Sequence, residues 1–424
     1  MSGLELIGPV PNHWSVKPLR LLGRLLKGTG GSKEDAVEEG VPCVRYGELY
    51  TTHRNFVEHA RTFVTPERAK EYTPIEYGDV LFAASGETIE EIGKSAVNLL
   101  HGAVCGGDVV ILRPTQQFVP RFLGYATDAA PVAAQKSLGG RGSTVMHVYP
   151  DELREVVIAV PPLAEQQSIS DFLDREAKRL DALVASKRRL LELLAEKRKT
   201  IVATAVTRGL DQSAKLRDSR VPWLGEIPTH WKAERVRWHF RERDQRGSPD
   251  LPLMEVSISK GVSVREFSDE RIEATASDFN TYKVARKDDI AFNKMRMWQG
   301  AVGVAPTDGL VSPDYVVAEP TGSVLPDFAG LLFRVDEFSA ECGRRSHGLT
   351  WDRLRIYWEE FREIEIPIPP LPEQAAIVAH VGLEAARVDA ARAATERTIG
   401  LLKERRSALI AAAVSGQLDL GPAA

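Results

Sequence analysis

The feature that most constrains this chain is that it contains two copies of one long segment. Residues 161–210 reappear as residues 369–418 at a constant offset of 208 and without a gap, and 21 of the 50 positions are identical. The shared letters include PPLAEQ against PPLPEQ and LLAEKR against LLKERR. The small units of solenoid proteins recur at about 20–50 residues. The much longer period found here predicts two domain-sized units in tandem.

A weaker similarity extends the repeat toward its N-terminal side. The segment IGPVPNHW, residues 7–14, matches LGEIPTHW, residues 224–231, at an offset of 217. The offset drifts because the loops between the matching parts differ in length. Each half therefore reads as a divergent block followed by a similar helix, which predicts two different recognition tasks on one symmetric frame.

The composition is that of an ordinary globular protein. With 424 residues, 43% of them hydrophobic, the chain can bury at least two cores, and its length suits roughly two to four domains. No apolar stretch approaches the length of a membrane span, and the N-terminal sequence lacks the pattern of a signal peptide. Cys43, Cys105 and Cys342 are odd in number and far apart, which fits a reducing compartment. We expect a cytoplasmic protein with no membrane partner.

Both copies of the repeated segment are predicted to be long helices with an apolar stripe. Apolar residues recur every seven positions with polar interruptions, which is the pattern of a coiled-coil seam. The stripe residues are Leu173, Leu180, Leu183, Leu190, Leu194 and Ile201 in the first helix and Val381, Val388, Leu402 and Leu409 in the second. We expect the helices to pair antiparallel, because each needs to bury its stripe and a pseudo-twofold axis would relate the two repeats. The alternative is that each helix packs only on its own domain.

Local signals set the ends of both helices. Pro161, Pro162 and then Glu165 in the first turn mark a helix start, and Gly209 and Gly416 offer the left-handed residue that ends a helix. Each helix would contain about 40 residues and extend roughly 60 Å. That length exceeds the diameter of one globular domain.

The divergent blocks carry short apolar runs broken by glycine and proline, which predict strands. Such runs occur at 79–83, 108–112 and 315–318, and each block ends in a strand, VVIAVPPL or IEIPIPPL, that leads into the helix. A mixed α+β fold follows. The predicted order is a mixed α/β domain at 1–158, a long helix at 159–210, a linker at 211–220, a second mixed α/β domain at 221–366 and a second long helix at 367–420.

The order of these parts resembles the specificity subunit of type I restriction-modification systems. A variable block, a strand ending in PPLxEQ, a long helix, a linker and then WLGEIPTHW form such a series. The second block is similar to target recognition domains of this family at residues 292–304, FNKMRMWQGAVGV, and 309–317, GLVSPDYVV. The first block is similar to them at residues 85–96, SGETIEEIGKSA. The resemblance covers essentially the whole chain, and its strength lies in the repeated order of the motifs.

The resemblance implies a non-catalytic DNA reader. Family members bind one half of a split double-stranded DNA target with each target recognition domain. Their paired helices form an antiparallel coiled coil that sets the spacing and docks two modification (methyltransferase) subunits, and restriction/translocase subunits complete the assembly. S-adenosylmethionine, ATP and magnesium are then expected on the partner subunits, with no cofactor in this chain. Because the two blocks differ, the two half-sites are expected to differ as well.

Reading bases requires side chains at base edges and cations at phosphates. The net charge of −4 gives no bulk argument for nucleic acid, so local clusters matter. In the second block the best cluster consists of Lys294, Arg296, Trp298 and Gln299, just after a predicted strand. A solvated loop with one core tryptophan is the alternative interpretation.

The first block has candidates at the equivalent position after its own strand. They are Ser85, Gly86, Glu87, Thr88 and Lys94. Two further segments, 136–143 and 342–350, align at an offset of 206 and are predicted to be glycine-containing loops that suit contacts with the DNA backbone. They contribute Lys136, Arg141, Arg344 and Arg345. Surface loops often have this composition without any function.

The sequence carries no pattern typical of a catalytic site. Six residues separate Gly86 from Gly93 before Lys94 and Ser95, whereas a phosphate-binding P-loop has four between its glycines. Paired-cysteine and HExxH metal motifs, the dinucleotide fingerprint and the Asn/Asp-Pro-Pro-aromatic tetrapeptide of amino-methyltransferases are absent. We therefore expect methyl transfer and DNA cleavage to belong to other chains.

Two classes of function remain after this comparison. One is the DNA-specificity subunit, and the other is a two-domain coiled-coil scaffold that binds protein and reads no DNA. The basic run at 187–199 fits both, because a charged helix face is usually solvated and could pair with partner proteins or lie near DNA. Duplex binding that weakens steeply with salt while it keeps a sequence preference distinguishes the reader from the scaffold.

Overall fold

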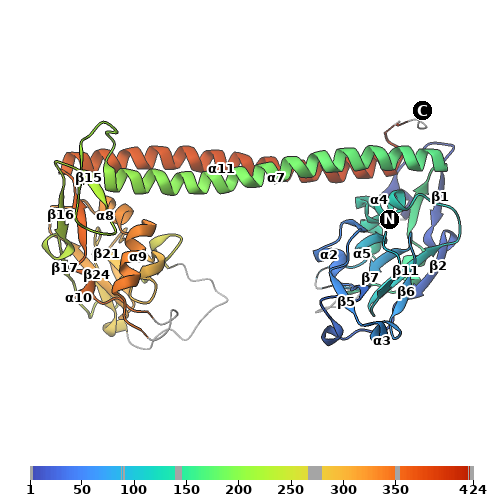
Figure 1. The fold of residues 1–424 in the computed structure, drawn as a ribbon, viewed down its shortest axis with the longest axis horizontal. Helices are drawn as coiled ribbons and strands as arrows, with labels where there is room; N and C mark the ends of the chain where they lie inside the picture. Colours follow the sequence, from blue (N-terminus) through green and yellow to red (C-terminus); the bar gives the residue numbers. More distant parts are fainter. Residues whose placement is uncertain are drawn as a thin grey trace. The chain divides into compact units, whose positions relative to one another are not determined.

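The chain folds into two compact units. The computed structural model describes residues 3–86, 88, 91–138, 146–265, 279–348, 354–418 and 420. Unit 1 comprises residues 1–187 and 396–424, and unit 2 comprises residues 188–395. Both divisions fall inside the two long helices, so each unit contains a mixed α/β body and one end of each long helix (Figure 1).

Unit 1 is built around two β-sheets. The first has the strand order β2 (Gly23–Lys27), β11 (Val109–Pro114), β7 (Val80–Ala83), β9 (Ser95–Asn98) and β4 (Asn55–Val57). The second has the order β5 (Thr62–Val64), β3 (Val41–Val44), β10 (Ala103–Cys105) and β6 (Thr73–Ile75). Two further pairs are β1 (Ser15–Pro18) with β13 (Val157–Val160) and β8 (Ser85–Gly86) with β12 (Met146–His147). The shorter helices are α1 (Gly3–Ile7), α2 (Glu48–Thr51), α3 (Pro66–Ala69), α4 (Pro120–Asp128), α5 (Ala130–Leu138) and α6 (Pro150–Arg154).

Strand β7 shows why the five-stranded sheet is buried on both faces. Its four residues are all apolar and fully buried, and side chains alternate between the two faces along a strand. Val80 and Phe82 belong to one core, which also contains residues of α4 and α5, whereas Leu81 and Ala83 belong to the core on the opposite face. The burial of β7 on both faces therefore fixes the position at which the segment from Ser85 begins.

Unit 2 repeats this plan with shorter elements. Its main sheet has the order β17 (Phe240–Glu242), β24 (Tyr315–Pro320), β21 (Ile290–Asn293) and β22 (Val302–Val304). The further pairs are β18 (Met254–Ser257) with β19 (Gly261–Val264), β20 (Lys283–Ala285) with β23 (Gly309–Val311), β16 (Lys232–Arg235) with β25 (Glu365–Ile368) and β14 (Leu216–Asp218) with β15 (Glu226–Pro228). Its shorter helices are α8 (Pro326–Leu332), α9 (Asp336–Arg345) and α10 (Trp358–Phe361). Strand β21 occupies the place that β7 has in unit 1, with Ile290 and Phe292 in one core and Ala291 in another.

The strands that the apolar runs predicted are confirmed, and one strand lies in a polar segment. The apolar runs at 79–83, 108–112 and 315–318 lie in β7, β11 and β24. The polar segment 211–220, which was predicted to be the linker between the halves, contains strand β14, paired with β15. The strand has no periodic apolar signal, because none of its three side chains is buried.

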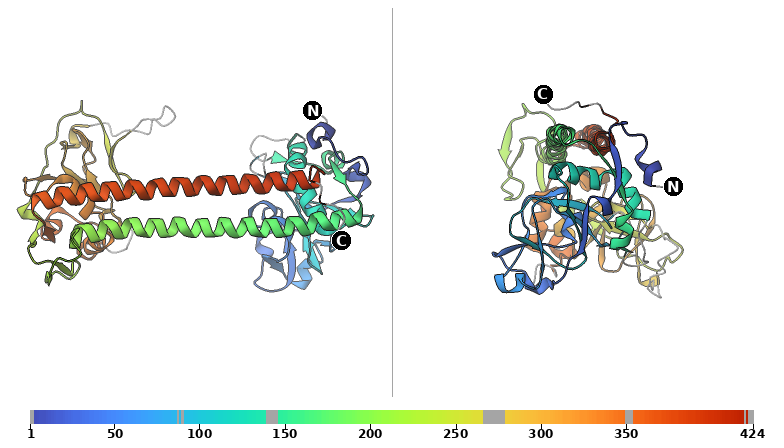
Figure 2. Two further views of the ribbon diagram at one scale, coloured as in Figure 1. Left: turned by 90° about the horizontal axis from the view of Figure 1, so that it is seen from above. Right: turned by 90° about the vertical axis from the view of Figure 1, so that its right-hand side faces the viewer.

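The two long helices are α7 (Leu163–Arg208) and α11 (Leu371–Val414), with 46 and 44 residues. They pack together and lie side by side in both views (Figures 1 and 2). In unit 1 a carboxylate oxygen of Asp181 lies 3.7 Å from Nε of Arg406, and in unit 2 Nε of Arg198 lies 3.7 Å from a carboxylate oxygen of Asp389. The two ion pairs are equivalent in the repeat, and each joins α7 to α11 within its own unit. None of the helices in the described ranges combines the length and apolarity that a bilayer span requires.

The predicted stripe is buried only in part. Leu173, Leu180, Val381 and Val388 are at most 4% exposed, and Leu194, Ile201, Leu402 and Leu409 are half-buried. Leu183 and Leu190, which the seven-residue pattern also assigned to the stripe, are 42% and 38% exposed. A straight α-helix drifts by about 20° per seven residues from a strict seven-residue repeat, so a row that starts on the buried side turns toward solvent.

The two motifs that recur most clearly in the sequence contact each other. The indole Nε1 of Trp14 donates a hydrogen bond to Glu165 at 2.9 Å, and Nε1 of Trp231 donates to Glu373 at 3.0 Å. The HW dipeptide is therefore tied to the first turn of the long helix in each half. This contact explains why the letters HW and PPLxEQ survive in both copies while the residues between them diverge.

The same tryptophans pack at the ends of the long helices. Gly209 and Gly416 follow α7 and α11 and have φ values of +79° and +74°, which confirms the predicted left-handed helix ends. A Cβ atom at Gly209 would lie 3.2 Å from the ring of Trp231, and one at Gly416 would lie 3.2 Å from the ring of Trp14. Each unit therefore joins the start of one long helix to the end of the other.

Candidate functional site

The candidate cluster of unit 2 forms a tight turn at the end of β21. The chain leaves the strand at Asn293, whose side-chain oxygen accepts a hydrogen bond from the backbone N of Met295 at 2.9 Å. A short 3-10 helix, η5 (Met297–Gln299), follows, and Met297 is fully buried and anchors it in the core. Gly300 at φ +84° then returns the chain to β22. The buried side chain of Met297 therefore anchors the turn, and Arg296 and Gln299 remain exposed.

The four predicted residues of this turn have different surroundings. Arg296 and Gln299 are exposed and reach solvent. Trp298 is half-buried, and its Nε1 donates to the main-chain oxygen of Met295 at 3.0 Å, so it braces the turn. Lys294 is half-buried, and burial together with the nearby Lys283 lowers the pKa of its ammonium.

A second segment, which the sequence reasoning missed, lies against this turn. The backbone N of Ile356 donates to the main-chain oxygen of Lys294 at 3.1 Å, and Nη2 of Arg355 lies 3.8 Å from Sδ of Met295. The ammonium of Lys294 lies 5.7 Å from the ring centroid of Tyr357, a cation–π contact. No local pattern marks these residues, because they follow the turn by about 60 positions in the sequence and precede only a four-residue helix.

Unit 1 builds the same kind of site from β8 and β12. Ser85 and Gly86 pair with His147 and Met146, and the hydroxyl of Ser85 lies 2.9 Å from Nδ1 of His147. Ser85 is 3% exposed, so its hydroxyl is used inside the protein. Thr88 is exposed, and its backbone N donates to the carboxylate of Glu91 at 3.2 Å. Glu87 and Arg141 lie outside the described residues.

Tyr149 and Tyr357 occupy equivalent places next to the two sites. They are 208 positions apart, and each precedes a short helix. The backbone N of Tyr149 donates to the carboxylate of Glu152 at 3.0 Å, and that of Tyr357 donates to Glu360 at 3.2 Å. Both rings are exposed, to 52% and 42%. A tyrosine at the same position of both repeats, within blocks that otherwise diverge, is the sequence feature that could have identified these two residues.

The two segments that were predicted to be glycine-containing loops begin as helices. Lys136 lies in α5 and is 1% exposed, which differs from the expected surface lysine. Arg344 and Arg345 lie in the last turn of α9, and the carboxylate of Glu341 accepts hydrogen bonds from them at 2.7 Å and 2.6 Å. The arginines are therefore already paired within their own helix, while α9 packs against η5 and brings them close to the turn.

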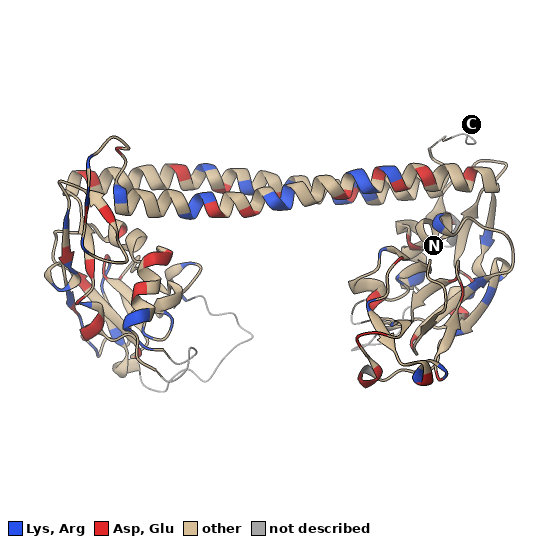
Figure 3. Ribbon diagram, in the orientation of Figure 1, with Lys and Arg blue, Asp and Glu red and all other residues tan. Residues whose placement is uncertain are grey.

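The basic run of α7 is also paired in part. Cations and acids are interspersed along both long helices (Figure 3). Within the run, Arg189 is 2.7 Å from Glu192 and Lys199 is 2.9 Å from Asp336, in addition to the Arg198 pair with Asp389. These exposed pairs are worth little individually, and they reduce the free positive charge that the run could offer to DNA.

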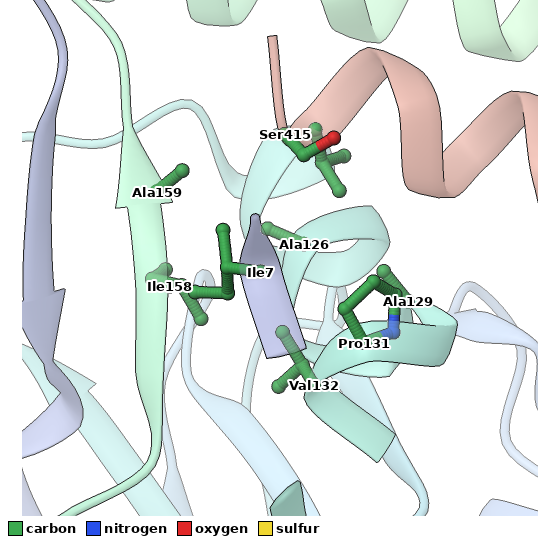
Figure 4. A pocket seen from close by; sticks show the side chains of 9 residues that line it. Ile7, Ala126, Ala129, Pro131, Val132, Ile158, Ala159 and Ser415 are labelled. Atoms are coloured by element: carbon green, nitrogen blue, oxygen red, sulfur yellow. The ribbon is translucent and has the colours of Figure 1, made fainter. Parts of the chain in front are cut away.

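A small cavity in unit 1 is lined almost entirely by apolar side chains (Figure 4). Its lining residues are Ile7, Ala126, Ala129, Pro131, Val132, Ile158, Ala159, Val414 and Ser415. The hydroxyl of Ser415 donates to the main-chain oxygen of Ala411 at 2.8 Å and is thereby satisfied. Over the part of the chain that the structure describes, no group of three or more His, Cys, Asp or Glu side chains is arranged to hold a metal ion.

Comparison with known proteins decides the relationship of the chain. No family model matches it. The specificity subunit of the type I restriction enzyme EcoKI from Escherichia coli K12 is 21% identical over 430 residues, which cover 97% of this chain and 90% of that protein. The chain is homologous to type I restriction enzyme specificity subunits. The similarity includes both divergent blocks and both long helices, as the duplicated sequence requires.

Two solved structures share the fold across the whole chain. The HsdS subunit from Thermoanaerobacter tengcongensis matches with a TM-score of 0.56 and 19% identity, covering 97% of this chain and 99% of the other. A chain from a structural study of complex assembly and conformational transition of the type I R-M system matches with a TM-score of 0.70 and 17% identity, covering 97% and 100%. The mixed α/β units joined by long helices are therefore the architecture of these specificity subunits.

Proposed function

We propose that this chain is the DNA sequence-specificity subunit of a type I restriction-modification complex. The observation that carries the proposal is the homology to the EcoKI specificity subunit over nearly the full length of both proteins. In this role the chain recognises an asymmetric, bipartite double-stranded DNA target, with one half-site for each α/β body. The four-stranded main sheet of unit 2 has the same order as the first four strands of the main sheet of unit 1, but the surface segments of the two bodies differ, which suits unlike half-sites.

The chain is a recognition subunit and not a catalyst. Its partners are two modification (methyltransferase) subunits and the restriction/translocase subunits, to which S-adenosylmethionine, ATP and magnesium belong. The assembly is a cytoplasmic one in this proposal, and a reducing compartment suits the free, buried thiols of Cys43, Cys105 and Cys342.

The target recognition domains are assigned to residues 1–158 and 221–366. In the second domain, Arg296 and Gln299 are proposed to read base edges, since both are exposed on a turn that Met297 and Trp298 hold rigidly. Lys294, Arg344 and Arg345 lie around that turn and suit phosphate contacts. In the first domain the proposed DNA-contacting residues are Glu87, Thr88, Lys94 and Arg141, while the buried Ser85 and Gly86 of β8 are proposed to hold this segment on the body.

The long helices are proposed to form an antiparallel coiled coil and to carry the docking surface for the modification subunits. The buried stripe residues and the equivalent ion pairs of Asp181 and Asp389 support the coiled coil. Leu183 and Leu190 are exposed leucines of α7 that suit a protein contact. In this proposal the segments 159–210 and 367–420 determine the distance between half-sites, and 211–220 connects the two halves.

Salt dependence tests the proposal. The chain, assembled with its modification subunits, is titrated with a duplex that contains the split target and with a duplex of scrambled sequence at increasing salt concentration. Phosphate contacts predict that log K falls linearly with log salt for both duplexes, and base reading predicts that the split target stays preferred. Binding without any sequence preference would favour the scaffold instead.

A further inference from the structure

We propose that Lys136 is a buried positioning residue that holds part of the DNA-contacting segment of unit 1, residues 91–95, through the carboxylate of Asp128. This inference rests on the proposed function, because it concerns how one of the two reading sites is kept in shape. It replaces the expectation that Lys136 contacts a phosphate directly.

The ammonium of Lys136 lies in an almost closed site beneath this segment. Its Nζ donates to the main-chain oxygen of Thr127 at 2.8 Å and to the hydroxyl of Ser95 at 3.4 Å, and it lies 3.9 Å from Oδ1 of Asp128. On its other side it lies 5.5 Å from the ring centroid of Phe82 in β7. A buried cation destabilises a protein unless partners of this kind surround it, so its retention requires an explanation beyond stability.

Asp128 connects this buried ammonium to the surface. Its Oδ2 lies 3.6 Å from Nζ of Lys94, and its Oδ1 accepts a hydrogen bond from the backbone N of Ser95 at 3.4 Å. One carboxylate therefore links Lys136, Lys94 and the first residue of β9. When Lys94 turns toward a phosphate, Lys136 still neutralises Asp128, so no unpaired carboxylate is left facing the DNA.

The aliphatic part of Lys136 supports the segment by shape. Gly93 has a φ of +66°, and a Cβ atom there would lie 3.0 Å and 3.1 Å from Cβ and Cδ of Lys136. The backbone N of Gly93 donates to the main-chain oxygen of Ala83 at 2.8 Å. The chain therefore returns to the sheet directly over the lysine stem, and only a glycine allows this approach.

Unit 2 supports its reading turn without a charge. Cys342, which matches Lys136 in the alignment of the repeats, is fully buried in α9 and belongs to the same core as Met297 beneath the turn. A neutral thiol thus stands where unit 1 has an ammonium. Because both sites belong to one chain, the half-site read by unit 2 is an internal control for the half-site read by unit 1.

The protonation of Lys136 provides a test that needs no substitution. Burial lowers the pKa of Lys136 to about 8, Lys94 lowers it as well, and Asp128 opposes the shift. Asp128 and Lys94 are the charged groups that face the ammonium. Above this pH the amine is neutral, and Asp128 loses its buried counterion.

The first experiment uses the K136M variant in the complex with its modification subunits. Binding is measured to duplexes with single base substitutions in one half-site at a time. Arg296→Ala identifies the half-site that unit 2 reads, and the other half-site is then the one that unit 1 reads. We expect K136M to lose about tenfold or more of the discrimination at the half-site of unit 1 and none at that of unit 2, in line with the loss of a base contact. Lys70→Met, which removes an exposed lysine of the same unit, is the matched control and is expected to change neither.

Two results of this experiment would overturn the inference. One is unchanged discrimination at both half-sites in K136M. The other is an equal loss at both half-sites with a lower melting temperature, because Lys136 would then only stabilise the fold. If the wild-type complex does not distinguish the bases of either half-site, the proposed function fails. If the wild type distinguishes them and K136M does so equally well, only the positioning role of Lys136 fails.

The second experiment keeps the inference testable even if K136M does not fold. The discrimination of the wild-type complex is measured at each half-site between pH 7 and pH 9. We expect it to fall several-fold at the half-site of unit 1 across the pKa of about 8, and to stay constant at the half-site of unit 2. A parallel change at both half-sites, or none at either, contradicts the positioning role.

Discussion

At the scale of single residues, the buried ammonium of Lys136 is the least expected feature. The side chain is almost fully buried, yet the structure keeps it charged by surrounding it with oxygens and an aromatic face. Such a group is unfavourable for stability compared with an apolar residue of the same shape. Its presence in one unit and the neutral Cys342 in the other show that the two candidate sites are supported differently.

The pH dependence of stability follows from this burial. The folded pKa of Lys136 is lowered to about 8 from the ordinary value of 10.5, so between these values the folded form is neutral while the unfolded form still binds a proton. Stability therefore rises with pH across this window, by on the order of 3 kcal/mol for the full shift. Denaturant unfolding of wild type and K136M at pH 7 and pH 9.5 measures it. The rise is expected in the wild type and not in the variant, and equal slopes for both proteins would show that other groups cause it.

Arg296 carries the clearest residue-scale prediction for recognition. Replacement by alanine should relax base preference at one position of one half-site by about 1–3 kcal/mol if the guanidinium makes a bidentate contact with a base. Lys287→Ala removes an exposed cation before the other end of β21 and serves as the control. Competition binding against a set of singly substituted duplexes gives the preference. An equal loss on all sequences would make Arg296 a phosphate contact instead.

The sequence predicted which of these side chains are exposed better than it predicted their contacts. A strand followed by Lys294, Arg296 and Gln299 is a local pattern, and the structure places Arg296 and Gln299 on an exposed turn. The contacts of Tyr357 and the burial of Lys136 depend on residues that are distant in the sequence. The apolar periodicity of a short helix does not show whether a lysine in its last turn has a buried or an exposed side chain.

At the scale of elements, the contact between tryptophan and glutamate organises each helix start. Replacing Glu373 by alanine leaves Nε1 of Trp231 buried without its acceptor and should destabilise unit 2 by about 1–3 kcal/mol. A double-mutant cycle with Trp231→Phe, followed by denaturant unfolding, isolates the interaction. His230→Ala removes only an exposed partner of the same carboxylate and is expected to cost less. Additive effects of Glu373→Ala and Trp231→Phe on the free energy of unfolding would exclude a coupling between these two residues.

The long helices were predictable because their signals are local. The apolar period, Glu165 in the first turn and the terminal glycines all act within a few residues of the position that they determine. The exposure of Leu183 and Leu190 was not predictable, since it depends on how the helices wind and on what the α/β bodies leave uncovered. Strand β14 was not predicted, because it is short and none of its side chains is buried, so its sequence has no apolar pattern.

At the scale of the whole molecule, helix length should determine the spacing of the target. Four residues inserted into α7 after Arg198 and into α11 before Asp389 keep the facing residues paired, because these two side chains contact each other. One added turn lengthens the helices by roughly 6 Å. The preferred spacer between half-sites should grow by about one or two base pairs, since a base pair rises roughly 3.4 Å along the duplex. Selection from a library of spacer lengths measures it, and an unchanged spacer would refute the role of the helices.

In the proposed function, this chain alone determines which DNA sequence the complex modifies. The most direct test is the pattern of base methylation across the genome of cells that contain the partner subunits, with and without this chain. We expect one split, asymmetric motif to be methylated in cells that contain the chain. This methylation should disappear when the chain is deleted and return when it is restored. A methylation pattern that is the same in the presence and the absence of the chain would contradict it.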